Sequence, residues 1–223
     1  MTAVATYWMP NPLTRDEAVY TAERENDLVR RCRHGDTAAF QAIYQKYRAQ
    51  IFRVVSRTVL NQADREEVTQ DVFLQVFKSL SSFQGSAKLS TWIHRVAVNV
   101  TLQHLRKKRS RIKLLFSKDT QHEATDRLPS PAASSPEERY AQKERQAAVE
   151  QALAKLSEKK RVALVLHDFE GLPAKEIAEI VSSPVLTVRT RVFYARKEFY
   201  ERLASEPAFG DFSLSAGKSE GGS

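Results

Sequence analysis

The sequence predicts an all-α fold made of two small helical domains joined by a flexible linker. Apolar residues recur at three- and four-residue spacing from residue 27 to 109 and again from 137 to 203, which is the periodicity of amphipathic helices. The chain has only 7 glycines, and no strand-like alternation of apolar and polar residues persists. Between the two helical parts, a stretch rich in proline and serine breaks the pattern, as linkers do.

These patterns divide the chain into five segments. Residues 1–24 have no clear period and form an N-terminal extension, and residues 25–111 form the first helical domain. Residues 112–136 are the linker, and residues 137–204 form the second helical domain. Residues 205–223 are rich in Gly and Ser, a composition that predicts a disordered tail.

The first domain is expected to hold successive amphipathic helices. Asp36 is placed to cap the first of them, and a break at 61–64 separates it from the next. That next helix carries a set of apolar residues expected on one face: Val68, Val72, Phe73, Val76, Phe77 and Leu80. A loop centred on Gly85 follows, and Ser90 is expected to cap a helix whose buried side includes Trp92, Ile93, Val96, Ala97, Val100 and His104.

The second domain ends in a helix-turn-helix pattern. Gly171 is expected to end one helix, a short helix then spans 173–181, and a tight turn leads to a helix rich in arginine. Ser183 is expected to cap this last helix, with Pro184 as its first residue. Its buried stripe is expected to be Val188, Val192, Ala195, Phe199 and Leu203.

The outward face of the last helix suits the major groove of DNA. Arg189 lies near its N-terminus, the end that usually meets base edges, and an exposed Phe193 can touch a thymine methyl group. Arg196 and Lys197 lie further along and suit phosphates, which set register and not sequence. A basic helix alone fits the solvated face of a bundle equally well, but the preceding short helix and tight turn favour DNA.

A second polar surface is predicted in the first domain. Arg95, Asn99, Gln103 and Arg106 recur at three- and four-residue spacing, so they form one stripe of a helix. A basic run follows at 106–113, and no acidic residue occurs before position 119, which gives an electrostatic footprint for a phosphate backbone. A basic, solvated helix end is the alternative interpretation.

The loop before that helix, residues 83–89, has a composition that can hold an unstacked base. It combines an aromatic side chain, small residues and a lysine, although most such loops are only connections. The preceding helix differs in charge, because Glu66, Glu67, Gln70 and Asp71 lie on its polar side. An acidic face repels DNA, so it suits a protein partner, unless it is an ordinary solvated face.

Composition narrows the function classes further. The formal net charge of +8 favours a polyanionic partner. Cys32 is the only cysteine, so no intrachain disulfide forms, and with His34 it makes a poor zinc pair. The sequence contains no Gly-rich phosphate loop, HExxH motif or cluster of cysteines, so we expect no enzyme activity, cofactor or metal. The chain has no apolar run of the ~20 residues that span a bilayer and no signal peptide, which predicts a cytoplasmic protein without stable membrane insertion.

Several motifs together resemble alternative sigma factors of the extracytoplasmic-function (ECF) type. The block DREEVTQDVF at 64–73, FQG at 83–85 and TWIHRVAVN at 91–99 resemble sigma region two. Residues 171–196 resemble sigma region four. The resemblance covers roughly residues 27–203, with both regions in the family order. It implies a promoter-specificity subunit that binds core RNA polymerase and promoter DNA, melts the DNA and has no catalytic activity.

The resemblance also implies roles for individual residues. The residues expected to bind the clamp coiled coil of the largest polymerase subunit include Glu67, Gln70, Asp71 and Leu74. Those expected to bind the minus-ten element, with one base flipped into the loop, are Phe83, Gln84, Gly85, Ser86, Lys88, Arg95, Asn99, Gln103 and Arg106. Those expected to bind the minus-thirty-five element are Thr187, Arg189, Thr190, Phe193, Tyr194, Arg196 and Lys197. Region four would also meet the flap of the second subunit, and an anti-sigma factor is an expected partner.

Two positions depart from the family pattern. Pro173 stands where Ser or Thr is common, so the usual capping box with Glu176 is lost, although a proline in the first turn can substitute. Leu186 stands where glycine is common, and a bulkier side chain there can alter the approach to DNA. A stand-alone helix-turn-helix regulator that binds duplex DNA remains the alternative function.

Overall fold

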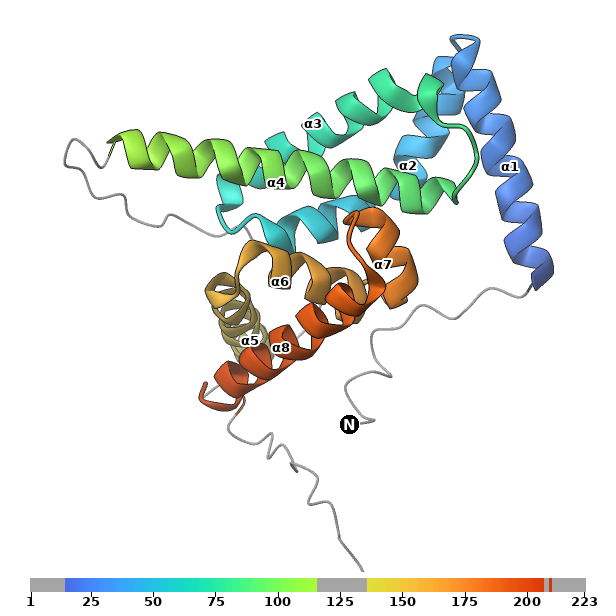
Figure 1. The fold of residues 1–223 in the computed structure, drawn as a ribbon. Coiled ribbons are helices and arrows are strands. Elements are labelled where there is room, and N and C mark those ends of the chain that lie inside the picture. The colour runs from blue at the N-terminus through green and yellow to red at the C-terminus, as the bar shows by residue number, and fades with distance from the viewer. Residues whose placement is uncertain (1–14, 116–135, 207–208, 210–223) are drawn as a thin grey trace, which may run out of the picture.

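The structure, a computed structural model, describes residues 15–115, 136–206 and 209, and these form two helical units (Figure 1). The helices of the first unit are α1 (Arg15–Arg33), α2 (Thr37–Thr58), α3 (Gln62–Ser79), the 3₁₀ turn η1 (Leu80–Ser82) and α4 (Leu89–Leu115). The helices of the second unit are α5 (Pro136–Lys155), α6 (Glu158–Leu164), the π-helical turn η2 (Val165–Phe169), α7 (Ala174–Ile180) and α8 (Val185–Ala204). The predicted all-α class with two helical domains is therefore confirmed. Most of the predicted linker and the Gly/Ser-rich tail lie outside the described residues.

Polar caps start two helices of the first unit. The Asp36 carboxylate accepts hydrogen bonds from the backbone N–H groups of Ala38 at 2.9 Å and Ala39 at 3.1 Å, which confirms the predicted cap. These backbone bonds, together with Arg31, lower the pKa of Asp36. Asn61, in the predicted break, caps α3 by accepting from the N–H of Ala63 at 2.9 Å.

Several predicted boundaries were wrong, among them the linker start at residue 112, because α4 continues to Leu115. Helix α1 begins at Arg15, inside the segment expected to be an extension without helical period. Helix α4 begins at Leu89, because the N–H of Trp92 already bonds the carbonyl of Lys88 at 3.1 Å, so Ser90 lies within the first turn and is no cap. Helix α8 begins at Val185, because Pro184 has an extended ψ of 143° while its carbonyl accepts from the N–H of Val188.

The core of the first unit forms where α2, α3 and α4 meet. Its fully buried residues include Ile43, Ile51, Val55, Val68, Val72 and Ile93. Phe77 was expected on the buried face of α3, but its side chain is 57% exposed. Its ring packs edge-on against Phe40 of α2, with ring centroids 4.9 Å apart.

The core of the second unit is built around α6 and α8, which cross each other (Figure 1). It buries Leu153, Leu164, Leu166, Ile177 and the predicted stripe of α8. Gly171 follows the π-helical turn with φ +70°, a backbone conformation that favours glycine. The predicted helix end at Gly171 is confirmed.

The two units pack directly against each other. Helix α4 contacts α7, and α2 contacts η2, α5 and α6 (Figure 1). Val54 of α2 and Val98 of α4 are 1% exposed, and they belong to the apolar cluster of the second unit. Arg161 of α6 donates to the carbonyl of Thr58 in α2 at 2.8 Å. Apolar packing of these two valines and the Arg161 hydrogen bond therefore join the two units.

Candidate nucleic-acid and polymerase interfaces

The helix-turn-helix consists of α7, a turn at 181–184, and α8. The N–H of Ser183 bonds the carbonyl of Ala178 at 3.1 Å, and Ser182 has a positive φ of 48°, so the chain reverses tightly. Buried Ile177 and Ile180 of α7 lie in the same apolar cluster as Val188 of α8. This packing fixes the angle at which α8 presents its outer face, which is what a groove-binding helix requires.

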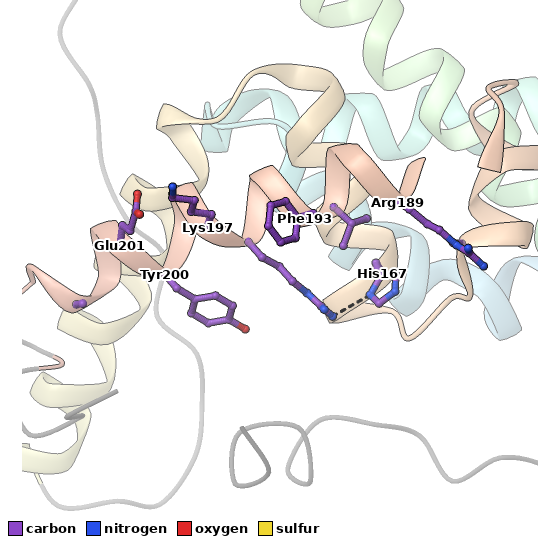
Figure 2. Close-up of a pocket in the computed structure, with 10 residues that line it drawn as sticks. His167, Arg189, Phe193, Lys197, Tyr200 and Glu201 are labelled. Carbon is purple, nitrogen blue, oxygen red and sulfur yellow. Dashed lines mark hydrogen bonds between the residues drawn. The ribbon is translucent and has the colours of Figure 1, made fainter. Parts of the chain in front are cut away.

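The outer face of α8 is open to solvent. Five of the residues predicted to bind the minus-thirty-five element are exposed, namely Arg189, Thr190, Phe193, Tyr194 and Lys197, and Thr187 is half-buried. Figure 2 shows Arg189, Phe193 and Lys197 projecting from this helix, with His167 of η2 nearby. They help to line an open groove of about 670 Å³, which runs beside α8 and also includes Tyr200 and Ala204.

Arg196 is held in place by a neighbouring carboxylate. Its guanidinium Nε and Nη2 donate to Asp168 at 2.8 and 2.7 Å, and Nη2 lies 3.1 Å from Nδ1 of His167. Burial acts to raise the pKa of Asp168, but hydrogen bonds from His167 and Arg196 outweigh it, so that pKa is lowered. Asp168 and His167 were not among the predicted site residues, because no local pattern marks a side chain that acts from a different helix.

The predicted polar stripe of α4 is also present. Arg95, Asn99, Gln103 and Arg106 are all exposed, whereas Ile93, Ala97 and Val98 on the other side are buried. The four side chains therefore share one solvent-facing strip of a long helix. Amide and guanidinium groups on such a strip can bond base edges and phosphates.

The loop between η1 and α4 differs from its expected form. Phe83 is only 4% exposed and packs on Trp92, with ring centroids 5.5 Å apart, so its ring is not available to stack on a base in this conformation. Arg33 holds the loop by donating to the carbonyl of Phe83. The exposed residues of the loop are Gln84, Gly85, Ser86 and Lys88.

Lys88 links this loop to the helix-turn-helix. Its ammonium group lies 2.8 Å from the carboxylate of Glu176 in α7, and its side chain is 72% exposed. An exposed ion pair of this kind contributes at most about 1 kcal/mol, so the contact can open easily. It places the predicted base-holding loop beside the second unit in this conformation.

The outer face of α3 combines acidic and apolar groups. The predicted polymerase-binding residues Glu67, Gln70, Asp71 and Leu74 are all exposed. The side chains of Leu74 and Phe77 are 56% and 57% exposed, and they lie one helical turn apart. Large apolar side chains rimmed by acidic ones are typical of a protein-binding surface.

Within the described residues, no three His, Cys, Asp or Glu side chains are grouped to hold a metal ion. No helix in the described part of the chain is long and apolar enough to span a membrane. Cys32 is a free, half-buried thiol whose pKa is raised by burial.

Comparisons with known proteins match both units. Residues 43–111 match the family model of sigma-70 region 2, and residues 146–199 match that of sigma-70 region 4. The chain is 33% identical to the RNA polymerase sigma-H factor of Pseudomonas aeruginosa over 82% of its own length and 95% of that protein. It is also 33% identical to the ECF RNA polymerase sigma-E factor of Escherichia coli, over 76% of its length and 89% of that protein.

Two solved structures share the fold. One is CnrH in complex with the cytosolic domain of CnrY, with a TM-score of 0.59, 18% identity and coverage of 82% of this chain and 99% of that chain. The other is the sigma factor RpoE in complex with the anti-sigma factor NepR from Bartonella quintana, with a TM-score of 0.62, 18% identity and coverage of 75% and 98%.

These matches decide between the function classes left open by the sequence. A stand-alone helix-turn-helix regulator has no use for a region-two domain, and the family is not enzymatic. Both regions match in the family order. The chain aligns with almost the whole length of each of the two relatives. The chain belongs to the ECF sigma factors, the subunits that bind core RNA polymerase and direct it to promoters.

Proposed function

We propose that the chain directs core RNA polymerase to its promoters by dividing the task between its two units. The supporting observation is the presence of two separate exposed polar strips, one on α4 and one on α8, in a chain that matches both sigma regions. Residues 25–111 would act as the region-two domain and residues 137–204 as the region-four domain. The chain would work in the cytoplasm, where polymerase meets the chromosome.

Core polymerase would bind the outer face of α3. The exposed carboxylates of Glu67 and Asp71 and the amide of Gln70 offer polar contacts, while Leu74 offers an apolar one. A mixed surface of this kind supports a protein partner, since apolar contact supplies affinity and charge supplies orientation. The partner surface would be the clamp coiled coil of the largest subunit, and region four would meet the flap of the second subunit.

The α4 surface would bind the minus-ten element. Arg95, Asn99, Gln103 and Arg106 would contact the melted strand, with the exposed loop residues Gln84, Ser86 and Lys88 beside them. A flipped base needs a loop that can rearrange. Among the described residues, the exposed Lys88–Glu176 ion pair ties this loop to the second unit, which supports its release when the two units separate on polymerase.

The α8 surface would bind the minus-thirty-five element. Arg189 would pair with a base edge near the helix N-terminus, and Lys197 would contact a phosphate. Neither side chain bonds another residue in the described part of the chain, so both are free to reach DNA. Arg196 would contact the DNA while it stays paired with Asp168, because this pair holds its guanidinium in a fixed orientation.

An anti-sigma factor would control the chain. Two structural neighbours are complexes with CnrY and with the anti-sigma factor NepR. A partner that clamps both units together would cover the α3 or α4 surfaces while the units remain docked. We expect such a partner to bind the full chain more tightly than either unit alone, since it would contact both.

Direct binding to core polymerase tests the main proposal. The purified chain is titrated into bacterial core RNA polymerase that lacks any sigma subunit, at near-physiological salt, and the complex is followed by co-elution. A tight one-to-one complex is the expected result, and it leads to run-off transcription on genomic fragments. If the chain does not bind core polymerase but still binds bare duplex DNA, the proposal is contradicted. The chain would then act as a stand-alone regulator.

A further inference from the structure

The outer face of α8 exposes three large apolar or aromatic side chains. Leu186 is 74% exposed, Phe193 64% and Tyr194 50%. Single exposed apolar residues are common on any protein surface, but these three lie within the first three turns of one helix. Leu186 belongs to neither apolar cluster of the described residues. Its side chain therefore has no structural task that explains a leucine at this position.

Helical spacing places Leu186 in line with the predicted contact residues. Thr190 follows it by four residues and Phe193 by seven, so all three lie on the same side of α8. The Thr190 hydroxyl donates to the carbonyl of Leu186 at 3.0 Å, so its proton is already used. The ring of Phe193 packs edge-on against Tyr194, with centroids 5.3 Å apart, which limits its freedom.

Few charged groups are available at this end of the helix to read bases. Arg191 donates to the Ser183 hydroxyl at 3.2 Å, and Arg196 is paired with Asp168. Arg189 is the arginine of α8 that remains without a partner within the described part of the chain. Discrimination near the N-terminus of α8 must therefore come largely from one guanidinium and from apolar contact.

Thymine is the base that offers an apolar contact in the major groove. Its 5-methyl group projects there, whereas the other bases present only hydrogen-bonding groups. A leucine cannot form a hydrogen bond with any of those groups. Burying such a donor or acceptor against leucine, without a partner, costs free energy. The N-terminal residues of a recognition helix are the ones that meet base edges, and Leu186 is the second residue of α8.

We propose that Leu186 is a specificity-determining residue that contacts the 5-methyl group of a thymine in the minus-thirty-five element. The contact adds a methyl-reading position ahead of Arg189 and on the same side of α8 as Phe193. It rests on the proposed function of α8, and it assigns that surface a substrate class: a duplex element with a thymine at the position nearest the N-terminus of α8.

Removal of single methyl groups from the DNA tests this contact. Holoenzyme reconstituted from core polymerase and the full chain is first used to select a preferred minus-thirty-five element from a randomised library. Each thymine of that element is then replaced by deoxyuridine, which lacks only the methyl group. Affinity is measured for wild-type chain and for Leu186→Ala, so that the two changes form a double-mutant cycle.

One deoxyuridine position should weaken wild-type binding by about fourfold, the factor expected when one methyl group is no longer buried. Leu186→Ala should bind thymine and deoxyuridine at that position equally well. In the reverse design, 5-methylcytosine should restore part of the affinity lost when cytosine replaces that thymine. Leu60→Ala, which truncates a 41% exposed leucine of the first unit, serves as the matched control and should keep the wild-type preference.

Three outcomes would overturn the inference. Equal loss on deoxyuridine in the wild type and in Leu186→Ala would show that the leucine does not touch the methyl group. Methyl dependence that persists in Leu186→Ala but vanishes in Phe193→Ala would assign the contact to the aromatic ring alone. A holoenzyme that forms but selects no minus-thirty-five element would remove the α8 assignment itself, and failure to form holoenzyme would instead contradict the proposed function.

Because Leu186 is exposed, its substitution should not disturb the fold, and thermal unfolding of the variant verifies this. Leu186→Asn provides a second variant, which is expected to exchange the preference for thymine for a preference for adenine.

Discussion

Arg53 of α2 donates two hydrogen bonds to the carboxylate of Glu170, which lies 117 residues further along the chain. The distances are 3.3 Å from Nε and 3.0 Å from Nη2. The Glu170 side chain is 1% exposed, and Nη1 of Arg57 lies 3.5 Å from its Oε1. One buried carboxylate in the second unit is thus held between two arginines of the first.

Glu170→Gln should weaken the docking of the two units. The amide cannot balance the charge of Arg57, whose side chain is only 18% exposed. Breaking a fully buried pair typically costs 3–5 kcal/mol, and because Arg53 is 46% exposed we expect about 2 kcal/mol. Small-angle scattering should show a larger radius of gyration than for wild type. Glu179→Gln, on the exposed side of α7, is the control, and identical scattering from both variants would contradict the prediction.

Arg161→Met should destabilise the second unit. The Arg161 guanidinium donates to the backbone carbonyls of Leu153, Ala154, Leu156 and Thr58, and the residue is 4% exposed. Methionine fills a similar volume but removes all four hydrogen bonds, at a cost of about 2–4 kcal/mol in the free energy of unfolding. Urea denaturation measures the loss. Lys159→Met, on the neighbouring exposed position, should change stability little.

Acidification should destabilise the chain through His94. The ring is fully buried, Nδ1 lies 2.8 Å from the carbonyl of Ser90, and Nε2 has no partner among the described residues. Burial lowers the pKa of His94 below its usual 6.5, even though Glu170 and Glu176 act to raise it. As the pH falls, His94 therefore binds a proton at a higher pH in the unfolded chain than in the folded chain. Stability is complete above the unfolded pKa and falls as pH drops below it, by up to about 1.4 kcal/mol per pH unit.

The free energy of unfolding, measured between pH 7.5 and 5.5, tests this dependence. His94→Leu should flatten the profile over that range, because the buried group no longer titrates. His34→Gln changes an exposed histidine and should keep the wild-type slope. A slope that survives in His94→Leu would place the titrating group elsewhere.

Gln70→Ala combined with Asp71→Arg should lower affinity for core polymerase. Both side chains are exposed on α3, away from the two apolar cores, so the fold should be unaffected. Reversing a charge at an interface changes how the partners orient as they bind and how fast the complex dissociates. We therefore expect the complex with core polymerase to be at least tenfold weaker in titration. Glu144→Arg on α5, also exposed, carries the same charge reversal outside α3. Equal affinity of both variants would remove α3 as the binding surface.

Arg189→Ala should reduce promoter-dependent transcription while core polymerase binding persists. Loss of a bidentate contact to one base costs about 1–3 kcal/mol of discrimination, which corresponds to roughly a tenfold fall in run-off product at limiting holoenzyme. Arg145→Ala, exposed on α5, is the control and should transcribe as the wild type does. If Arg189→Ala loses polymerase binding instead, α8 is not the promoter-reading helix.

Local patterns predicted the helices and most of their faces. The stripe from Val188 to Leu203 is buried as expected, because a 3.6-residue period alone determines which residues share a side of a helix. Asp36 caps α2 as expected, since a cap acts on N–H groups two or three residues away. The start of α4 was placed two residues too late and that of α8 one residue too early, because several neighbouring polar or proline residues suit the same helix end.

Contacts between distant residues were not predictable in the same way. Phe83 was expected to be available for a base, but α4 and the loop bring Trp92 against it. Arg196 was expected to face outward like Lys197, but η2 places Asp168 beside it. In both cases the deciding neighbour lies on another element, so no spacing along one helix reveals it.

The sequence by itself determined the helical class, the two units, the apolar stripes and the polar strips of α4 and α8, because all of these depend on residues within one or two helical turns. Only the tertiary structure decided that the units dock, that Glu170 lies between Arg53 and Arg57, and that Lys88 meets Glu176. Those contacts arise from the burial of Val54 and Val98 in the core of the other unit. Apolar burial is non-directional, so its partners are set by how whole helices pack together and not by the order of residues along any one of them.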